Sequence, residues 1–272
     1  MSSWKQAVAR AFDGAEGYDR AAGIQGRVAA RLAERIAALP LAPAPRVLEI
    51  GCGTGFLTAA LRERLAPRSL LATDIAPGMI DRARARAPEG GGLRYLVMDG
   101  ERPCLAPVPR FDLIASSLAV QWFEDLPGSV ETLSRLLAPG GWLALATLAD
   151  GTFAEWRRAH LAQGCAPATP AYPTPASLRA IAAPGCTLSV ETEPLVEAHP
   201  DGRAFLSALR AIGAGTPRGG RPLPAGALRR VLRDFDAAGA RVTYRVATCL
   251  VRREPGQAAE MSTRMLPRVA CE

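Results

Sequence analysis

Residues 46–55 are Arg-Val-Leu-Glu-Ile-Gly-Cys-Gly-Thr-Gly, a short apolar run that ends in three alternate glycines. The apolar half is too short for a helix and predicts a buried strand of a parallel sheet. Gly51, Gly53 and Gly55 have no side chains that would keep a ligand away from the backbone. Thr54 is expected to begin a helix whose free N–H groups face the same place. The stretch therefore predicts a strand, a tight turn and a helix that together bind a polar ligand.

Further apolar segments follow at the intervals expected for strands, over residues 69–74, 93–99, 111–116 and 142–147. The segments between them are expected to be helical, over residues 56–65, 77–89 and 127–137. This alternation predicts a doubly wound α/β sheet. Asp74 and Asp99 end the second and third strands, so both carboxylates are expected at the same sheet edge as the glycine turn.

Composition and pattern divide the chain into four parts. Residues 1–42 are expected to form an N-terminal helical cap, with helices over 3–12 and 21–39, and residues 43–150 the sheet core. Residues 151–254 are expected to add lid helices over 151–163, 201–212 and 225–238, a proline-rich loop over 166–175, and closing strands over 187–196 and 243–251. The expected fold is a seven-stranded, mostly parallel sheet covered by a helical lid. Residues 255–272 are expected to be a disordered tail.

The composition indicates a sizeable core and a basic surface. The chain has 272 residues, 49% of them hydrophobic, and a net charge of +7 with a pI near 9.5, carried mainly by arginine. This charge suits either a plain solvated surface or an acidic partner met by electrostatic steering. Six cysteines without a CxxC pair argue against zinc, and we expect no metal. No apolar run approaches the ~20 residues of a membrane span, so we expect a cytoplasmic protein without a membrane partner.

The spacing of the glycines separates two kinds of cofactor. Dinucleotide sites favour GxGxxG, but Phe56 stands where their third glycine would be, which makes a nicotinamide dinucleotide the less favoured alternative. A carboxylate at Asp74 could accept hydrogen bonds from both hydroxyls of a ribose. A carboxylate at Asp99 could reach the amino group of an adenine. The pattern therefore outlines a bound adenosine.

This pattern of glycine turn and strand-end acids resembles the class I S-adenosylmethionine-dependent methyltransferases. The resemblance implies that the glycine loop lies along the methionine part of S-adenosylmethionine, that Asp74 holds the ribose and that Asp99 flanks the adenine. It implies cofactor contacts from Gln25, Glu49, Gly51, Gly53, Gly55, Asp74, Ile75, Met79, Asp99, Gly100 and Ser116.

Residues 116–122, Ser-Ser-Leu-Ala-Val-Gln-Trp, resemble a motif of the malonyl-acyl-carrier-protein O-methyltransferases of biotin synthesis. The resemblance implies methyl transfer from S-adenosylmethionine to the free carboxylate of malonyl-acyl-carrier protein. It implies a substrate site formed by Tyr18, Gln121, Trp122, Arg210 and Tyr244, of which the first three position the reactants. It also implies an acidic carrier bearing malonyl-phosphopantetheine, docked on arginines such as Arg203, Arg210, Arg218, Arg221, Arg229 and Arg230. Ser117 and Arg210 depart from the usual Asn and Lys.

Plainer interpretations of these residues stay open. Trp122 could be a hydrophobic anchor, Gln121 a turn residue and Tyr244 a half-buried strand aromatic. His160 and His199 lie in no motif with a nucleophile, which disfavours a catalytic triad. Alternative functions are a methyltransferase of small carboxylates such as aconitate, an RNA methyltransferase, or a regulator without turnover. No basic stripe interleaved with aromatic residues is present, so nucleic acid is not an expected partner.

Overall fold

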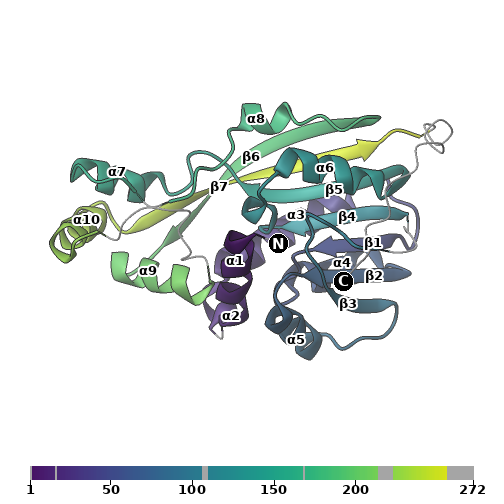
Figure 1. Ribbon diagram of the computed structural model, residues 1–272, viewed down its shortest axis with the longest axis horizontal. Coiled ribbons are helices and arrows are strands. Elements are labelled where there is room, and N and C mark those ends of the chain that lie inside the picture. Colours follow the sequence, from purple (N-terminus) through teal and green to yellow (C-terminus); the bar gives the residue numbers. More distant parts are fainter. Residues whose placement is uncertain (1, 16, 106–109, 168, 214–222, 256–272) are drawn as a thin grey trace.

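The computed structural model describes residues 2–15, 17–105, 110–167, 169–213 and 223–255. Within them, the strands form one seven-stranded sheet in the order β3-β2-β1-β4-β5-β7-β6 (Figure 1). The pairs among β1 to β5 are parallel, and β7 runs antiparallel to both β5 and β6. The predicted doubly wound, mostly parallel sheet is confirmed. The strands are β1 Arg46–Ile50, β2 Ser69–Asp74, β3 Leu93–Val97, β4 Phe111–Ser117, β5 Leu137–Leu148, β6 Cys186–Ala198 and β7 Arg241–Arg253.

Helices cover both faces of this sheet because successive strand residues point to opposite sides. Val47 packs in one core cluster with α3, α4 and α5, whereas Leu48 packs in a second cluster with α6. The α-helices are α1 Ser3–Asp13, α2 Tyr18–Ala21, α3 Gly23–Ala37, α4 Phe56–Leu65, α5 Pro77–Arg86, α6 Leu126–Arg135, α7 Ala154–Ala162, α8 Pro175–Arg179, α9 Gly202–Ala211 and α10 Ala225–Ala237; a 3-10 helix, η1, spans Val120–Trp122.

The helix after the glycine turn differs from the sequence expectation, and the short helix α8 was not expected. The helix after the glycine turn starts at Phe56 and not at Thr54, because Gly55 still has a positive φ of 93° and belongs to the turn. The short helix α8 lies just after the expected proline-rich loop. Thr174 caps it by accepting a hydrogen bond from the Ser177 amide, and Pro175 occupies its first turn.

The last strands are longer than the sequence indicated. β5 begins at Leu137, so residues 139–141 continue the strand past a register shift against β4. β6 and β7 have 13 residues each and extend beyond the core, where α7, α9 and α10 gather at one end (Figure 1). The helices α1 and α2 lie between that end and the sheet core. The expected tail falls almost wholly outside the described residues. None of the described helices is long and apolar enough to cross a membrane.

Candidate functional site

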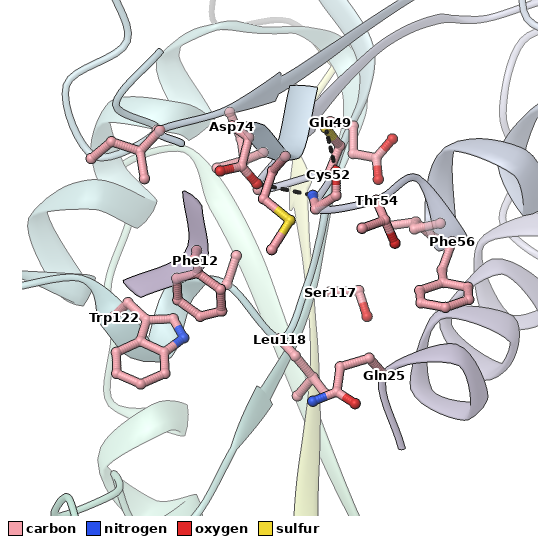
Figure 2. Close-up of a pocket in the computed structure, with 18 of the residues that line it drawn as sticks. Phe12, Gln25, Glu49, Cys52, Thr54, Phe56, Asp74, Ser117, Leu118 and Trp122 are labelled. Atoms are coloured by element: carbon pink, nitrogen blue, oxygen red, sulfur yellow. Dashed lines mark hydrogen bonds between the residues drawn. The ribbon is translucent and has the colours of Figure 1, made fainter. Parts of the chain in front are cut away.

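The glycine turn after β1 is closed by backbone and carboxylate contacts. Gly51 and Gly53 have positive φ angles of 67° and 55°, and a Cβ at Gly51 would overlap the side chain of Ala119. Asp74, at the end of β2, accepts the Gly53 amide at 2.9 Å (Figure 2) and the Ala76 amide at 2.9 Å. These bonds fix the carboxylate at the carboxyl edge of the sheet, where parallel α/β folds bind their ligands.

A cavity opens over this turn, and we call it the sheet-edge cavity. Its free space, counted to the open mouth, is about 900 Å³. The sheet contributes the strand ends, and α1 and α3 close the other side (Figure 2). Of the residues expected to contact a cofactor, the cavity brings together Gln25, Glu49, Gly51, Gly53, Asp74, Ile75, Met79, Asp99 and Gly100.

Two of the expected cofactor residues do not line the sheet-edge cavity. Gly55 caps the N-terminus of α4. Ser116 is fully buried, and its hydroxyl donates to the Ile50 carbonyl at 2.8 Å, which ties β4 to β1. The next residue, Ser117, lines the cavity instead, because neighbouring residues of a strand face opposite sides.

Glu49 carries an unsatisfied oxygen at the cavity. The residue is 1% exposed, and its Oε2 accepts the Thr58 hydroxyl at 2.6 Å. Within the described part of the chain its buried Oε1 accepts no hydrogen bond. Burial raises the pKa of Glu49 to about 7, with a smaller contribution from the nearby charge of Asp74. An unpaired buried carboxylate oxygen of this kind fits a cationic group of a ligand.

The structure adds Lys5, which sequence reasoning missed. Its Nζ lies 2.7 Å from both carboxylate oxygens of Asp99, and the side chain lines the sheet-edge cavity. The sequence did hold a signal, because Lys5 shares one face of α1 with Val8 and Phe12 at spacings of three and seven residues. A lysine in such an apolar stripe indicates a buried charge partner.

A second hollow, which we call the aromatic cavity, lies beside the first. Its free space, counted to the mouth, is about 1740 Å³. Its lining comes from α2, η1, α7, α9 and β7, and is largely aromatic and aliphatic. It brings together all the residues expected to bind substrate: Tyr18, Gln121, Trp122, Arg210 and Tyr244. Arg210 is exposed, whereas Tyr244 is 6% exposed.

The two cavities share one wall. Phe12, Tyr18, Gln25, Leu118 and Trp122 line both of them. The Trp122 ring packs edge-on against Phe12 with ring centroids 5.5 Å apart. Ligands in the two cavities would therefore meet at this shared wall.

The polar groups of the shared wall are the hydroxyl of Tyr18, the amide of Gln25 and the indole N–H of Trp122. Burial raises the pKa of Tyr18, as do the charges of Asp74 and Asp19, so its hydroxyl stays protonated at neutral pH and can donate a hydrogen bond. The Oε1 of Gln25 is buried and makes no hydrogen bond to any residue that the structure describes. The wall thus offers donors from Tyr18 and Trp122 and an acceptor from Gln25 in apolar surroundings.

Comparisons with known proteins identify the type of domain and its fold. A family model described as a methyltransferase domain matches residues 48–145. The fold resembles the YcgJ protein of Bacillus subtilis, with a TM-score of 0.58 and 16% identity over 83% of this chain and 98% of that one. It also resembles a phosphoethanolamine N-methyltransferase of Haemonchus contortus, with a TM-score of 0.52 and 16% identity over 84% of this chain and 52% of that one.

Sequence relatives narrow the family. The biotin biosynthesis bifunctional protein BioCD of Bordetella avium is 49% identical over 89% of this chain, which spans about half (51%) of that longer protein. A malonyl-[acyl-carrier protein] O-methyltransferase of Magnetococcus marinus is 44% identical over 88% of this chain and 89% of its own length. By its sequence, this chain belongs to the malonyl-[acyl-carrier protein] O-methyltransferase family.

Proposed function

We propose that the chain transfers a methyl group from S-adenosylmethionine to the free carboxylate of malonyl-acyl-carrier protein, in the service of biotin synthesis. The observation that carries this proposal is the shared wall of the two cavities. It gives a nucleotide cofactor and a second, longer ligand one common boundary lined by Tyr18 and Trp122.

The residues of the sheet-edge cavity fit S-adenosylmethionine, which supplies an electrophilic methyl group on a sulfonium. Asp74 would accept the ribose hydroxyls, and Ile75 and Met79 would pack against the adenine. The unpaired Oε1 of Glu49 would face the amino group of the methionine part, and the bare backbone at Gly53 would allow close approach. Ser117 takes the place at the cavity that the sequence assigned to Ser116.

The transfer itself needs no general base. A carboxylic acid with a reference pKa near 4 is ionised at neutral pH, so the substrate is already a nucleophile. One carboxylate oxygen forms a bond to the methyl carbon, the carbon–sulfur bond breaks, and its electron pair stays on sulfur. The protein contributes alignment and exclusion of water at the shared wall. Tyr18, protonated because burial raises its pKa, would donate to the carboxylate oxygen that does not attack.

The aromatic cavity suits the acyl chain and its phosphopantetheine arm better than a small free carboxylate. Its walls are mostly aromatic and aliphatic, with few groups that could pair with the several charges of a tricarboxylate. Arg210 lies on the exposed side of α9, where it would meet the thioester or the arm. A bidentate pair with the attacking carboxylate would lower its nucleophilicity, so Arg210 is not assigned that contact.

The charge pattern supports an acidic carrier as partner. Arginines near the core pair with acids, such as Arg35 with Glu191 and Arg135 with Glu131. In the part of the chain that the structure describes, no such pair involves the docking candidates Arg203, Arg210, Arg229 and Arg230 of α9 and α10. Their charge is free to attract an acidic protein. Arg218 and Arg221 lie outside the described residues.

A substrate comparison tests this function. We expect kcat/KM for malonyl-carrier to exceed that for malonyl-CoA, and aconitate to be the poorest substrate, because only the carrier uses both the aromatic cavity and the arginines. The advantage of the carrier over malonyl-CoA should shrink as salt rises. Equal or faster methylation of aconitate would replace the proposal with a small-carboxylate methyltransferase.

A further inference from the structure

Lys5 is the only lysine in the sequence; every other one of the 33 basic side chains is arginine. It is also among the most buried charged residues, at 5% exposure, whereas Arg10 on the same helix is exposed. The one lysine of the chain therefore lies at a buried position, where its charge is shielded from water. Such a position requires a full set of partners.

The Lys5 ammonium has three acceptors within reach of one nitrogen. Both oxygens of Asp99 lie 2.7 Å from Nζ, and Glu101 forms a second ion pair. An ammonium has three N–H donors on a single atom, so the three oxygens satisfy it completely. Arginine would spread its donors over a planar fork. Gly100, between Asp99 and Glu101, packs tightly against the sheet, since a Cβ on Gly100 would overlap the Ile50 side chain.

This ion cluster fastens α1 to the sheet core. Within α1 only Lys5 and Val8 are buried, while Trp4 and Phe12 are partly exposed and pack their rings against Trp122. Glu101 also accepts the backbone amide of Asp125 at 2.6 Å, which joins the segment before α6 to the same cluster. At the other end of α1, Asp13 accepts the Gly78 amide at 2.6 Å. The ion pairs of Lys5 thus fix the N-terminal end of α1.

The arrangement of the cluster leaves the Asp99 carboxylate able to accept one more hydrogen bond. Its Oδ1 already accepts hydrogen bonds from Lys5 and from the Glu101 amide, the latter at 3.0 Å, while Oδ2 accepts only from Lys5 among the residues that the structure describes. A carboxylate oxygen can accept two hydrogen bonds, so Oδ2 has room for another. An adenine amino group is a donor of the kind that this oxygen can accept.

We propose that Lys5 is a positioning residue of the cofactor site, which holds α1 closed over the sheet-edge cavity and orients Asp99 toward the adenine. The proposal rests on S-adenosylmethionine as the ligand of that cavity. Bound cofactor and docked α1 then stabilise each other, since α1 forms a wall of the cavity.

Amine labelling of the unmodified protein tests the closure directly, because Lys5 is the only side-chain amine. We expect acetylation of Lys5, followed by peptide mass spectrometry against N-acetyl-lysine as rate standard, to slow at least about tenfold with saturating S-adenosylhomocysteine. Equal labelling rates with and without this ligand would overturn the proposal. The measurement needs no turnover and no variant.

The variant Lys5→Met tests the contribution to affinity. We expect its dissociation constant for S-adenosylhomocysteine, measured by calorimetry, to rise at least about tenfold, because Asp99 and Glu101 lose their counter-charge. Arg10→Met removes one charge from the exposed side of the same helix and should bind normally. Lys5→Met binding as tightly as the parent protein would refute the role of Lys5. A parent protein that does not bind the ligand would instead refute the proposed function.

Discussion

The sheet-edge cavity holds bare backbone and the carboxylates of Glu49, Asp74 and Asp99 among apolar lining residues, whereas rings and aliphatic chains line most of the aromatic cavity. The first owes its polar geometry to hydrogen bonds such as that from the Gly53 amide to Asp74. The second is held by ring packing, as between Phe153 and Tyr244 at 5.1 Å and between Trp156 and Phe205 at 5.4 Å. A fixed polar site suits one cofactor, and an apolar site suits a long acyl arm.

Because the two cavities differ in this way, substitutions in them should impair different steps of the reaction. Loss of a polar group in the sheet-edge cavity should weaken ligand binding, because Glu49 and Asp74 are buried there and Asp74 also holds the glycine turn. Loss of a group in the aromatic cavity should change substrate affinity or the transfer step and leave cofactor binding almost intact. Measurements of S-adenosylhomocysteine binding beside steady-state kinetics separate the two kinds.

The largest effect is expected from Asp74→Ala. The change removes the predicted ribose contacts and frees the Gly53 and Ala76 amides, so affinity for S-adenosylhomocysteine should fall roughly 100-fold or more. Calorimetry gives the dissociation constant. Asp81→Ala is the control, because Asp81 is an exposed acid on α5. Similar affinities for the two variants would remove Asp74 from the cofactor site.

The next largest effect is a pH dependence of ligand affinity, which arises from the ionisation of Glu49. Burial raises its pKa to about 7 in the ligand-free protein, and an ammonium ligand favours the ionised form. Binding must then expel a proton below pH 7, so affinity for S-adenosylhomocysteine should fall by about tenfold per pH unit as pH decreases below 7 and level off above it. Glu49→Gln should bind with a flat profile. A profile equally steep in this variant would assign the titration to another group.

A smaller effect is expected at the shared wall. Tyr18→Phe removes the donor to the substrate carboxylate, so kcat should fall about tenfold while affinity for S-adenosylhomocysteine changes less than about threefold. Tyr172→Phe provides the matched control, since Tyr172 lines the aromatic cavity but not the sheet-edge cavity. Single-turnover kinetics would measure the transfer step. A Tyr18→Phe enzyme with unchanged kcat would leave Tyr18 as a packing residue only.

The smallest effect is expected from Arg210→Ala. Arg210 is exposed at the aromatic cavity, so KM for malonyl-carrier should rise about fivefold and kcat should stay within about twofold. Arg94→Ala is the control, because it removes the same charge from an exposed position on β3 that lines neither cavity. An equal fall in kcat at saturating carrier would contradict a purely binding role for Arg210.

The sheet-edge cavity could largely be predicted from the sequence because its parts are local. The glycine turn directly follows β1, Asp74 ends β2, and Asp99 lies two residues after the end of β3. Parallel strands bring these ends to one edge of the sheet. The prediction missed by one position at Ser116, since strand ends and the facing of their last residues depend on pairing with β1. Lys5 was missed because its partners lie 94 and 96 positions away.

The aromatic cavity could be predicted only through resemblance. Tyr18, Trp122 and Tyr244 come from three distant segments, and no local pattern states that α2, η1 and β7 converge. The convergence depends on the long strands β6 and β7, which extend beyond the core to the end of the molecule where α7 and α9 lie (Figure 1). The resemblance identified the individual residues, but nothing in the local sequence predicted that they form one site.

The central claim is that one ligand from each cavity reacts at the shared wall. Intact-mass spectrometry of malonyl-carrier, incubated with the protein and S-adenosylmethionine, tests it most directly. We predict that the carrier gains the mass of one CH₂ group, and that a carrier loaded with an acetyl group, which has no free carboxylate, gains nothing. An unchanged malonyl-carrier in the presence of a protein that binds S-adenosylhomocysteine would contradict the account.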